Sequence, residues 1–278
     1  MPKVVFSDGE LKRFLEEFKD YLVESPNEYI AYFFKVNGST VSIYKNGTVL
    51  FQGPNLEIFK EYTKEEITTY EYDNYNVIGA DEVGTGDVFG PIVCASVYVS
   101  KDKVQRLKDL GIKDSKELKD DRIIYLAQII IKEFPHQVSI CRNEVYNDNI
   151  NKINLNAMKA KLHNLNIKNL TNRVEYDMVV LDEFASEENY FSYLSDSAFK
   201  DIHFEYKGES KSIAVASSSI IARYYFLKEL DRLNKKYNLI IPKGSGDIAQ
   251  DLINKLRIEG KDDIFYHIAK LNFKNFKK

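Results

Sequence analysis

The first 70 residues alternate between helical and strand-like spacing of hydrophobic side chains. The segment Ser7-Asp8-Gly9-Glu10 has the spacing of a capping box, and apolar residues then recur every three or four positions as far as Leu22. We therefore expect an amphipathic helix that ends near Ser25-Pro26. A second helix is expected from Pro54 through Tyr62. Between them, strands are expected over 29–36, 40–44 and 48–52, with hairpin turns at Asn37-Gly38 and Asn46-Gly47.

Beyond a polar stretch at residues 64–76, short β-branched runs alternate with longer amphipathic segments. This order predicts an α/β domain in which helices cover a sheet. Strands are expected over 77–83, 92–99, 136–141 and 176–182. Helices are expected over 120–134, 155–170, 213–234 and 248–256. The chain therefore reads as a small N-terminal α+β unit, tethered to a larger α/β unit.

Two of the apolar runs end in carboxylates. The first delivers Asp81 and Glu82 to a glycine-bounded loop, and another ends at Asp182. In an α/β sheet the carboxyl ends of strands line a common crevice, so we expect Asp81 and Asp182 to meet there. Adjacent carboxylates repel one another and lose hydration, and a divalent cation offsets both costs. The alternative is an acidic pair that is solvated at a strand end.

Composition narrows the possibilities without deciding among them. The chain has 278 residues, 44% of them hydrophobic, and a formal net charge of −3, which indicates a folded globular protein without a global basic field. Cys94 and Cys141 lie in or beside apolar strands and are expected to be free, buried thiols in a reducing compartment. Neither a signal peptide nor an apolar run of bilayer-spanning length is apparent, so we expect a cytoplasmic protein.

The segment from Asp81 to Asp87, with Phe89-Gly90-Pro91 after it, resembles the signature of the type 2 ribonucleases H, and most closely that of ribonuclease HIII. Ribonuclease HII usually has arginine at the position of Thr85. The resemblance recurs in register at Asp114-Ser115-Lys116, Lys207-Gly208-Glu209 and Pro242-Lys243-Gly244-Ser245-Gly246.

The resemblance implies an architecture. It implies a ribonuclease H-like mixed sheet with flanking helices, formed by residues 75–278. It also implies that residues 1–70 form a domain similar to the TATA-box-binding protein fold, which holds the hybrid substrate. Exposed residues of the predicted meander, such as Lys35, Tyr44 and Lys45, are candidates for contacts with nucleic acid. The alternative for this unit is a solubilising or dimerising appendage.

The resemblance also implies an activity, which is hydrolysis of the RNA strand of RNA–DNA hybrids to leave 5′-phosphate and 3′-hydroxyl ends. Asp81, Glu82, Asp182 and Glu209 are the implied catalytic and metal-binding residues. All-oxygen ligands favour two Mg²⁺ or Mn²⁺ ions. The implied substrate contacts are Gly84, Thr85, Gly86, Ser115, Lys116 and Lys243. A monomer is expected.

Two alternatives to this function stay open. One is a ribonuclease HII, which cuts at single embedded ribonucleotides, although Thr85 and the N-terminal unit weigh against it. The other is a hybrid-binding protein that has lost catalysis, although the presence of all four acids weighs against it. His163 is set aside as a packing residue. Arg223 is expected to pair within the fold, and Glu205 is the local rival of Glu209.

Overall fold

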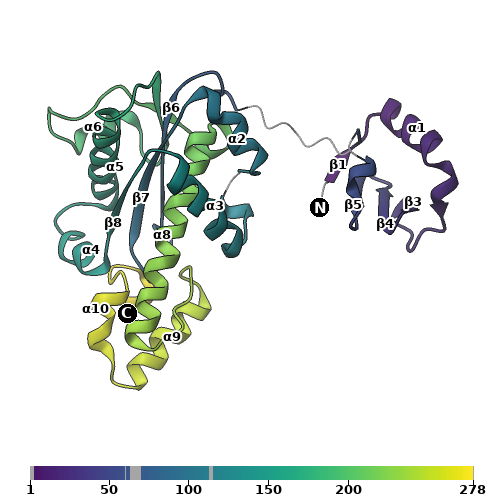
Figure 1. The fold of residues 1–278 in the computed structure, drawn as a ribbon. Coiled ribbons are helices and arrows are strands. Elements are labelled where there is room, and N and C mark those ends of the chain that lie inside the picture. The colour runs from purple at the N-terminus through teal and green to yellow at the C-terminus, as the bar shows by residue number, and fades with distance from the viewer. Residues whose placement is uncertain (1–2, 60, 63–69, 113–114, 278) are drawn as a thin grey trace. The chain divides into compact units, whose positions relative to one another are not determined.

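A computed structural model describes residues 3–59, 61–62, 70–112 and 115–277, and the chain divides into two compact units, Met1–Thr68 and Thr69–Lys278 (Figure 1). The first unit is a five-stranded antiparallel sheet in the order β1-β5-β4-β3-β2. Its strands are β1 (Lys3–Val5), β2 (Leu22–Val23), β3 (Ile30–Val36), β4 (Ser39–Tyr44) and β5 (Thr48–Gln52). One face packs against α1 (Asp8–Glu17), and the predicted capping box is present.

The three predicted strands and both hairpin turns of this unit are confirmed. Asn37 and Gly38 both have positive φ, as a tight turn of this kind requires. The expected length of the first helix is wrong, because α1 ends at Glu17 and is followed by the 3-10 turn η1 (Lys19–Tyr21) and then by β2. Pairing of Leu22 with Phe34 at the sheet edge replaces the last helical turns. A helix was expected from Pro54 through Tyr62. Among the described residues of that range, 54–59 and 61–62, the structure has the 3-10 turn η2 (Leu56–Phe59) and no α-helix.

The second unit contains a mixed sheet in the order β10-β9-β6-β7-β8. Strands β10, β9 and β6 run parallel, and β7 and β8 extend the sheet antiparallel to their neighbours. These strands are β6 (Val77–Val83), β7 (Ile92–Val99), β8 (His136–Cys141), β9 (Met178–Asp182) and β10 (His203–Glu205). The predicted fold class, a mixed sheet with flanking helices plus an N-terminal α+β unit, is confirmed.

The helices of this unit lie between and after its strands. They are α2 (Val104–Asp109), α3 (Asp120–Glu133), α4 (Asn143–Asn149), α5 (Leu155–Thr171), α6 (Glu187–Ser192), α7 (Gly208–Lys211), α8 (Ile213–Tyr237), α9 (Asp247–Ile258) and α10 (Phe265–Ile268). Short 3-10 turns occur at η3 (Lys101–Lys103), η4 (Ser115–Glu117), η5 (Asp262–Ile264) and η6 (Lys274–Phe276). The four helices predicted from the sequence correspond to α3, α5, α8 and α9, whereas α2, α4, α6 and α10 are too short to show a clear periodicity.

The sheet has a different helix on each face, and this division positions the site. On β6, Val77 belongs to the core that includes α8, whereas Ile78 and Ala80 pack with residues of α5. Figure 1 shows α8 as the long green helix that runs along β6 and β7. Gly79 permits this approach, because a Cβ atom there would lie 2.2 Å from backbone atoms of Ala214 and Val215. Among the described residues, no helix has the length and apolarity needed to span a membrane.

Candidate active site

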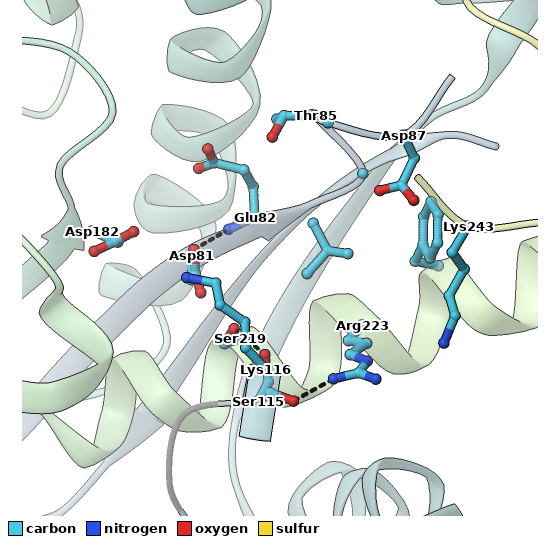
Figure 2. Close-up of a pocket in the computed structure, with 14 residues that line it drawn as sticks. Asp81, Glu82, Thr85, Asp87, Ser115, Lys116, Asp182, Ser219, Arg223 and Lys243 are labelled. Atoms are coloured by element: carbon cyan, nitrogen blue, oxygen red, sulfur yellow. Dashed lines mark hydrogen bonds between the residues drawn. The ribbon is translucent and has the colours of Figure 1, made fainter. Parts of the chain in front are cut away.

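A cleft of about 500 Å³ opens at the carboxyl end of β6 (Figure 2). Its lining comes from segments that are distant in the sequence, namely β6 with its following loop, η4, the end of β9, α8 and the loop before α9. The residues that line it are Asp81, Glu82, Val83, Gly84, Thr85, Gly86, Asp87, Ser115, Lys116, Asp182, Ser219, Arg223, Phe226 and Lys243. All candidates from the sequence except Glu209 are in this set.

Asp81 and Asp182 meet because β6 and β9 are adjacent parallel strands, with Ala80 opposite Leu181 in the register. Asp81 is 7% exposed, and its Oδ1 accepts a hydrogen bond of 2.6 Å from the backbone N–H of Glu82. Asp182 Oδ1 accepts one of 2.7 Å from the N–H of Gly208. Backbone donors therefore orient both carboxylates.

The electrostatics of this acidic pair are unfavourable without a cation. Burial, and then the nearby carboxylates of Glu82 and Asp182, raise the pKa of Asp81 well above its usual value. Burial and the carboxylate of Glu209 also raise the pKa of Asp182, to about 6, although the N–H of Gly208 opposes the shift. Raised pKa values of neighbouring carboxyl groups indicate that the site lacks positive charge, and a bound cation would supply that charge.

Glu82 has a different environment, because neighbouring residues of a strand point to opposite faces of the sheet. Its Oε1 accepts a hydrogen bond of 2.9 Å from Lys159 Nζ, and its Oε2 accepts one of 2.8 Å from His163 Nε2. Both donors lie on α5 and are buried. Burial alone would raise the pKa of Glu82, but His163 and Lys159 outweigh it and lower the pKa. Glu82 is thus an ionised carboxylate whose charge is compensated.

Glu209 lies beside this cleft rather than in its lining. Strand β10 ends at Glu205, and Glu209 belongs to the short helix α7. The turn between them places Lys207 in the left-handed region, with φ of 54°. Glu209 is 6% exposed and interacts with Asp182, and its Oε1 lies 3.3 Å from Lys116 Nζ. Its buried Oε2 has no hydrogen-bond partner among the described residues.

The rival acid Glu205 pairs with Lys211 and accepts a hydrogen bond from Tyr72, so its charge is used within the fold.

The oxygen atoms of the four acidic side chains are of the kind that binds a hard divalent cation, but the observed rotamers do not bring them together around one ion. Asp81, Glu82, Asp182 and Glu209 offer oxygen atoms, and Glu209 Oε2 is both buried and unpartnered in the described part of the chain. Within that part, no three acidic, histidine or cysteine side chains lie close enough together to hold one metal ion. Because the hydrogen bonds from α5 hold the Glu82 carboxylate, a metal that uses Glu82 has to compete with Lys159 and His163.

The loop after β6 contributes Gly84, Thr85, Gly86 and Asp87 to the lining of the cleft. Gly84 has a φ of 99°, and a Cβ atom there would lie 2.1 Å from the carbonyl oxygen of Pro91. Only glycine fits this position, because the loop folds back on the start of β7. At Gly86 a Cβ atom would meet nothing within 4 Å, so the backbone there is open to a ligand.

Basic residues also line the cleft. Lys243 Nζ lies 2.6 Å from Asp120, and Arg223 Nη2 lies 2.7 Å from the same carboxylate. Arg223 also donates a hydrogen bond to the carbonyl of Ser115, so it pairs within the fold as expected. Ser115 and Ser219 are linked by their hydroxyl groups at 2.8 Å. Asp114, the first residue of the Asp114-Ser115-Lys116 motif, and the preceding Lys113 lie outside the described residues.

Sequence reasoning missed Lys159 and His163. His163 was treated as a packing residue, and Lys159 was not considered. The available signal was weak, because the two residues are four positions apart on one helix and therefore share a face. Nothing in the sequence identified Glu82 as the acid that this face meets.

Comparisons with known proteins agree with this geometry. The family model described as Ribonuclease HII matches residues 78–276, and the one described as a domain of unknown function (DUF3378) matches residues 4–71. A protein named Ribonuclease HIII from Staphylococcus haemolyticus is 40% identical over 270 residues, which cover 88% of this chain and 86% of that protein. One from Bacillus licheniformis is 38% identical over 269 residues, which cover 88% and 86%.

Solved structures give the same result. The crystal structure of Bst-RNase HIII in complex with Mn²⁺ is similar, with a TM-score of 0.71 and 31% identity over 99% of this chain and 96% of that one. The structure of RNase H3 from Aquifex aeolicus has a TM-score of 0.61 and 26% identity over 98% and 100%. Both matches extend over the two units of the chain.

Proposed function

The chain belongs to the type 2 ribonuclease H family, in its ribonuclease HIII branch, and from this premise we propose that it hydrolyses the RNA strand of RNA–DNA hybrids. The products would carry 5′-phosphate and 3′-hydroxyl ends. One observation supports this function above the others. Asp81 and Asp182 lie on adjacent strands and have raised pKa values, and the cleft that contains them is also lined by the Gly84–Gly86 loop.

The cofactor of this activity is a pair of Mg²⁺ or Mn²⁺ ions, and a relative has been crystallised with Mn²⁺. Asp81, Glu82, Asp182 and Glu209 would hold them, because carboxylate oxygens are the ligands that hard cations prefer. When bound there, two such ions would supply the activation of a water molecule and the stabilisation of the leaving 3′-oxygen of a phosphodiester.

The protein itself supplies position and charge. The N–H groups of Glu82 and Gly208 hold the carboxylates of Asp81 and Asp182 toward the cleft. Lys116 and Lys243 lie in its lining, where an ammonium can contact a phosphate. Gly84, Thr85 and Gly86 line the cleft, and Gly86 is exposed, so backbone groups of this loop are placed for hydrogen bonds with a ribose 2′-hydroxyl, the group that distinguishes RNA from DNA.

The N-terminal unit is proposed to hold the hybrid. One face of its sheet packs on α1, and the other carries Lys35 and Tyr44 on neighbouring strands. Tyr44 lines a groove of about 310 Å³ with Asn46, Thr48 and Leu50. A tyrosine ring beside polar groups can stack on a base or a sugar, and the exposed Lys35 and Lys45 can pair with phosphates.

We further propose that the protein acts as a monomer in the cytoplasm. Cys94 and Cys141 are free and buried, and this suits a reducing compartment.

A comparison of three substrates tests the proposed activity. Purified protein is incubated in Mg²⁺ with an RNA–DNA hybrid, with a DNA duplex that contains one ribonucleotide, and with the DNA duplex alone. Preferred cleavage of the hybrid supports the proposal. Preferred cleavage at the single ribonucleotide indicates a ribonuclease HII activity, and hybrid binding without cleavage indicates a binding protein.

A further inference from the structure

Lys270 is a lysine with a fully buried side chain. Its relative exposure is 0%, and it follows α10 in the C-terminal segment. Its Nζ donates hydrogen bonds of 2.8 Å to the carbonyl of Asp87 and 2.6 Å to the carbonyl of Gly90. The rings of Tyr146 and Phe273 lie 5.9 Å from the same nitrogen. Lys270 therefore points inward, at the loop that joins β6 to β7.

The backbone around Lys270 is joined to the same loop. The N–H of Lys270 donates 2.8 Å to the carbonyl of Val88, and the N–H of Gly90 donates 2.9 Å to the carbonyl of Ile268. Phe89 and Ala269 form an isolated antiparallel bridge. The C-terminal segment thus acts as a short additional strand along the loop, with the lysine side chain across the turn.

Burying an ammonium group is costly, and a methionine of similar length would fill the same space. Burial lowers the pKa of Lys270 to about 7, although Asp87 and Cys141 oppose the shift. The compensation comes from two backbone carbonyls that lie three residues apart. Because packing alone does not require a charged group here, the hydrogen bonds to Asp87 and Gly90 explain its presence.

The loop held by Lys270 is the one that forms a wall of the cleft. Gly84, Thr85, Gly86 and Asp87 line the cleft, and the N–H of Asp87 contacts the carbonyl of Gly84 at 3.4 Å. The carboxylate of Asp87 also accepts a hydrogen bond of 2.5 Å from the N–H of Gly244. The backbone of Asp87 is therefore hydrogen-bonded to the C-terminal segment, and its side chain is hydrogen-bonded to the loop before α9. Asp87 also lines the cleft.

We propose that Lys270 is a positioning residue, which sets the shape of the Gly84–Gly90 loop from behind and thereby aligns the loop backbone with the ribose at the cleft. This inference rests on the proposed hybrid-cleaving function, because it assigns a substrate contact to the loop. Lys270 does not itself line the cleft. Its effect on the reaction passes through the two carbonyls that it holds.

Two variants test this role. Lys270→Met removes the donors and keeps the length of the side chain, and Lys274→Met is a matched control, because Lys274 is exposed in the same segment. We expect Lys270→Met to lower kcat on a hybrid at least tenfold while the Kd for the hybrid changes less than threefold. Lys274→Met should match the wild type in both. Equal kcat values for Lys270→Met and the wild type would overturn the proposal.

Hydrogen exchange supplies a readout that does not depend on activity. Amides of residues 84–90 should exchange faster in Lys270→Met than in Lys274→Met, whereas those of β7 and α8 should keep their protection. Uniformly faster exchange through the unit, with kcat and Kd worsening together, would mean a general stabilising role and overturn the proposal. If the wild-type protein leaves the hybrid intact, the proposed function fails, and the exchange of residues 84–90 still decides whether Lys270 holds the loop.

Discussion

His163 Nε2 lies 2.8 Å from the Oε2 atom of Glu82, inside the face of the sheet that α5 covers. Lys159 completes the pair of donors, and its Nζ lies 3.9 Å from the ring centroid of Phe184. The pKa values of two adjacent acids are therefore shifted in opposite directions for a structural reason. Glu82 faces cationic or hydrogen-bonding groups and has a lowered pKa, whereas Asp81 faces other carboxylates and has a raised one.

Replacing Lys159 with methionine should destabilise the fold. The side chains of Lys159 and Glu82 are 7% and 10% exposed, so the variant leaves a buried carboxylate with one partner fewer. Removing one partner of a buried ion pair costs about 3 to 5 kcal/mol. Lys161→Met is the matched control, because Lys161 is exposed on the same helix. Chemical denaturation measures both, and equal unfolding free energies for the two variants would show that the Lys159 pair contributes nothing.

In the presence of a metal chelator, which keeps the site free of metal, the free energy of unfolding should fall as the pH rises from about 4 to about 6. The folded-state pKa of Asp182 is raised from 3.8 to about 6, so the folded protein binds this proton more tightly than the unfolded chain does. The stabilisation is full at low pH and is lost as the pH passes through the folded-state pKa. Unfolding midpoints measured between pH 4 and pH 7 for the wild type and Asp182→Asn isolate the effect.

The difference in stability between Asp182→Asn and the wild type should grow in favour of the variant across that range. Added Mn²⁺ should reverse the difference by stabilising the wild type. A difference that is independent of pH would contradict the raised pKa of Asp182.

Gly79→Ala should destabilise the second unit strongly. The added Cβ would lie 2.2 Å from backbone atoms of Ala214 and Val215, and backbone cannot move aside as a side chain can. Overpacking of this kind costs about 1 to 3 kcal/mol, or more where backbone must shift. Gly86→Ala is the control, because nothing lies within 4 Å of its added Cβ. Thermal unfolding should separate the two, and equal melting temperatures would contradict the close contact between β6 and α8.

Tyr44→Ala should weaken hybrid binding without slowing the chemical step. Stacking on an aromatic ring is worth about 1 to 3 kcal/mol per base, which corresponds to a rise in Kd of roughly five- to 150-fold. Tyr21→Ala is the control, because Tyr21 is exposed on η1, outside the sheet. Fluorescence anisotropy gives Kd, and single-turnover cleavage gives the rate. An unchanged Kd would remove Tyr44 from the proposed binding face.

The sequence allowed a good prediction of the strands and of the acids at their ends. The pattern around Asp81 and Asp182 is local, since each acid ends its own apolar run, and the carboxyl ends of adjacent parallel strands share an edge. The hairpins of the first unit were also predictable, because Asn37-Gly38 and Asn46-Gly47 specify tight turns.

Contacts made across the fold were not predictable in the same way. Lys159 lies 77 residues from Glu82, and Lys270 lies 183 residues from Asp87, so local sequence gives no sign of either pair. Both lysines are buried, against the usual exposure of this residue type, and their partners are fixed only when helices and loops pack. Strand alternation explains why Glu82 faces α5, but it does not identify Lys159 and His163 as its partners.

The most direct test of the acidic site is the cleavage rate of Asp81→Asn and Glu209→Gln on an RNA–DNA hybrid in Mg²⁺. Each variant should cleave at least about a hundredfold more slowly than the wild type, because each removes an oxygen atom of a proposed metal ligand. The Kd for the hybrid should stay within about threefold of the wild-type value. Wild-type turnover by Glu209→Gln would remove that residue from the site, and wild-type turnover by Asp81→Asn would contradict the account as a whole.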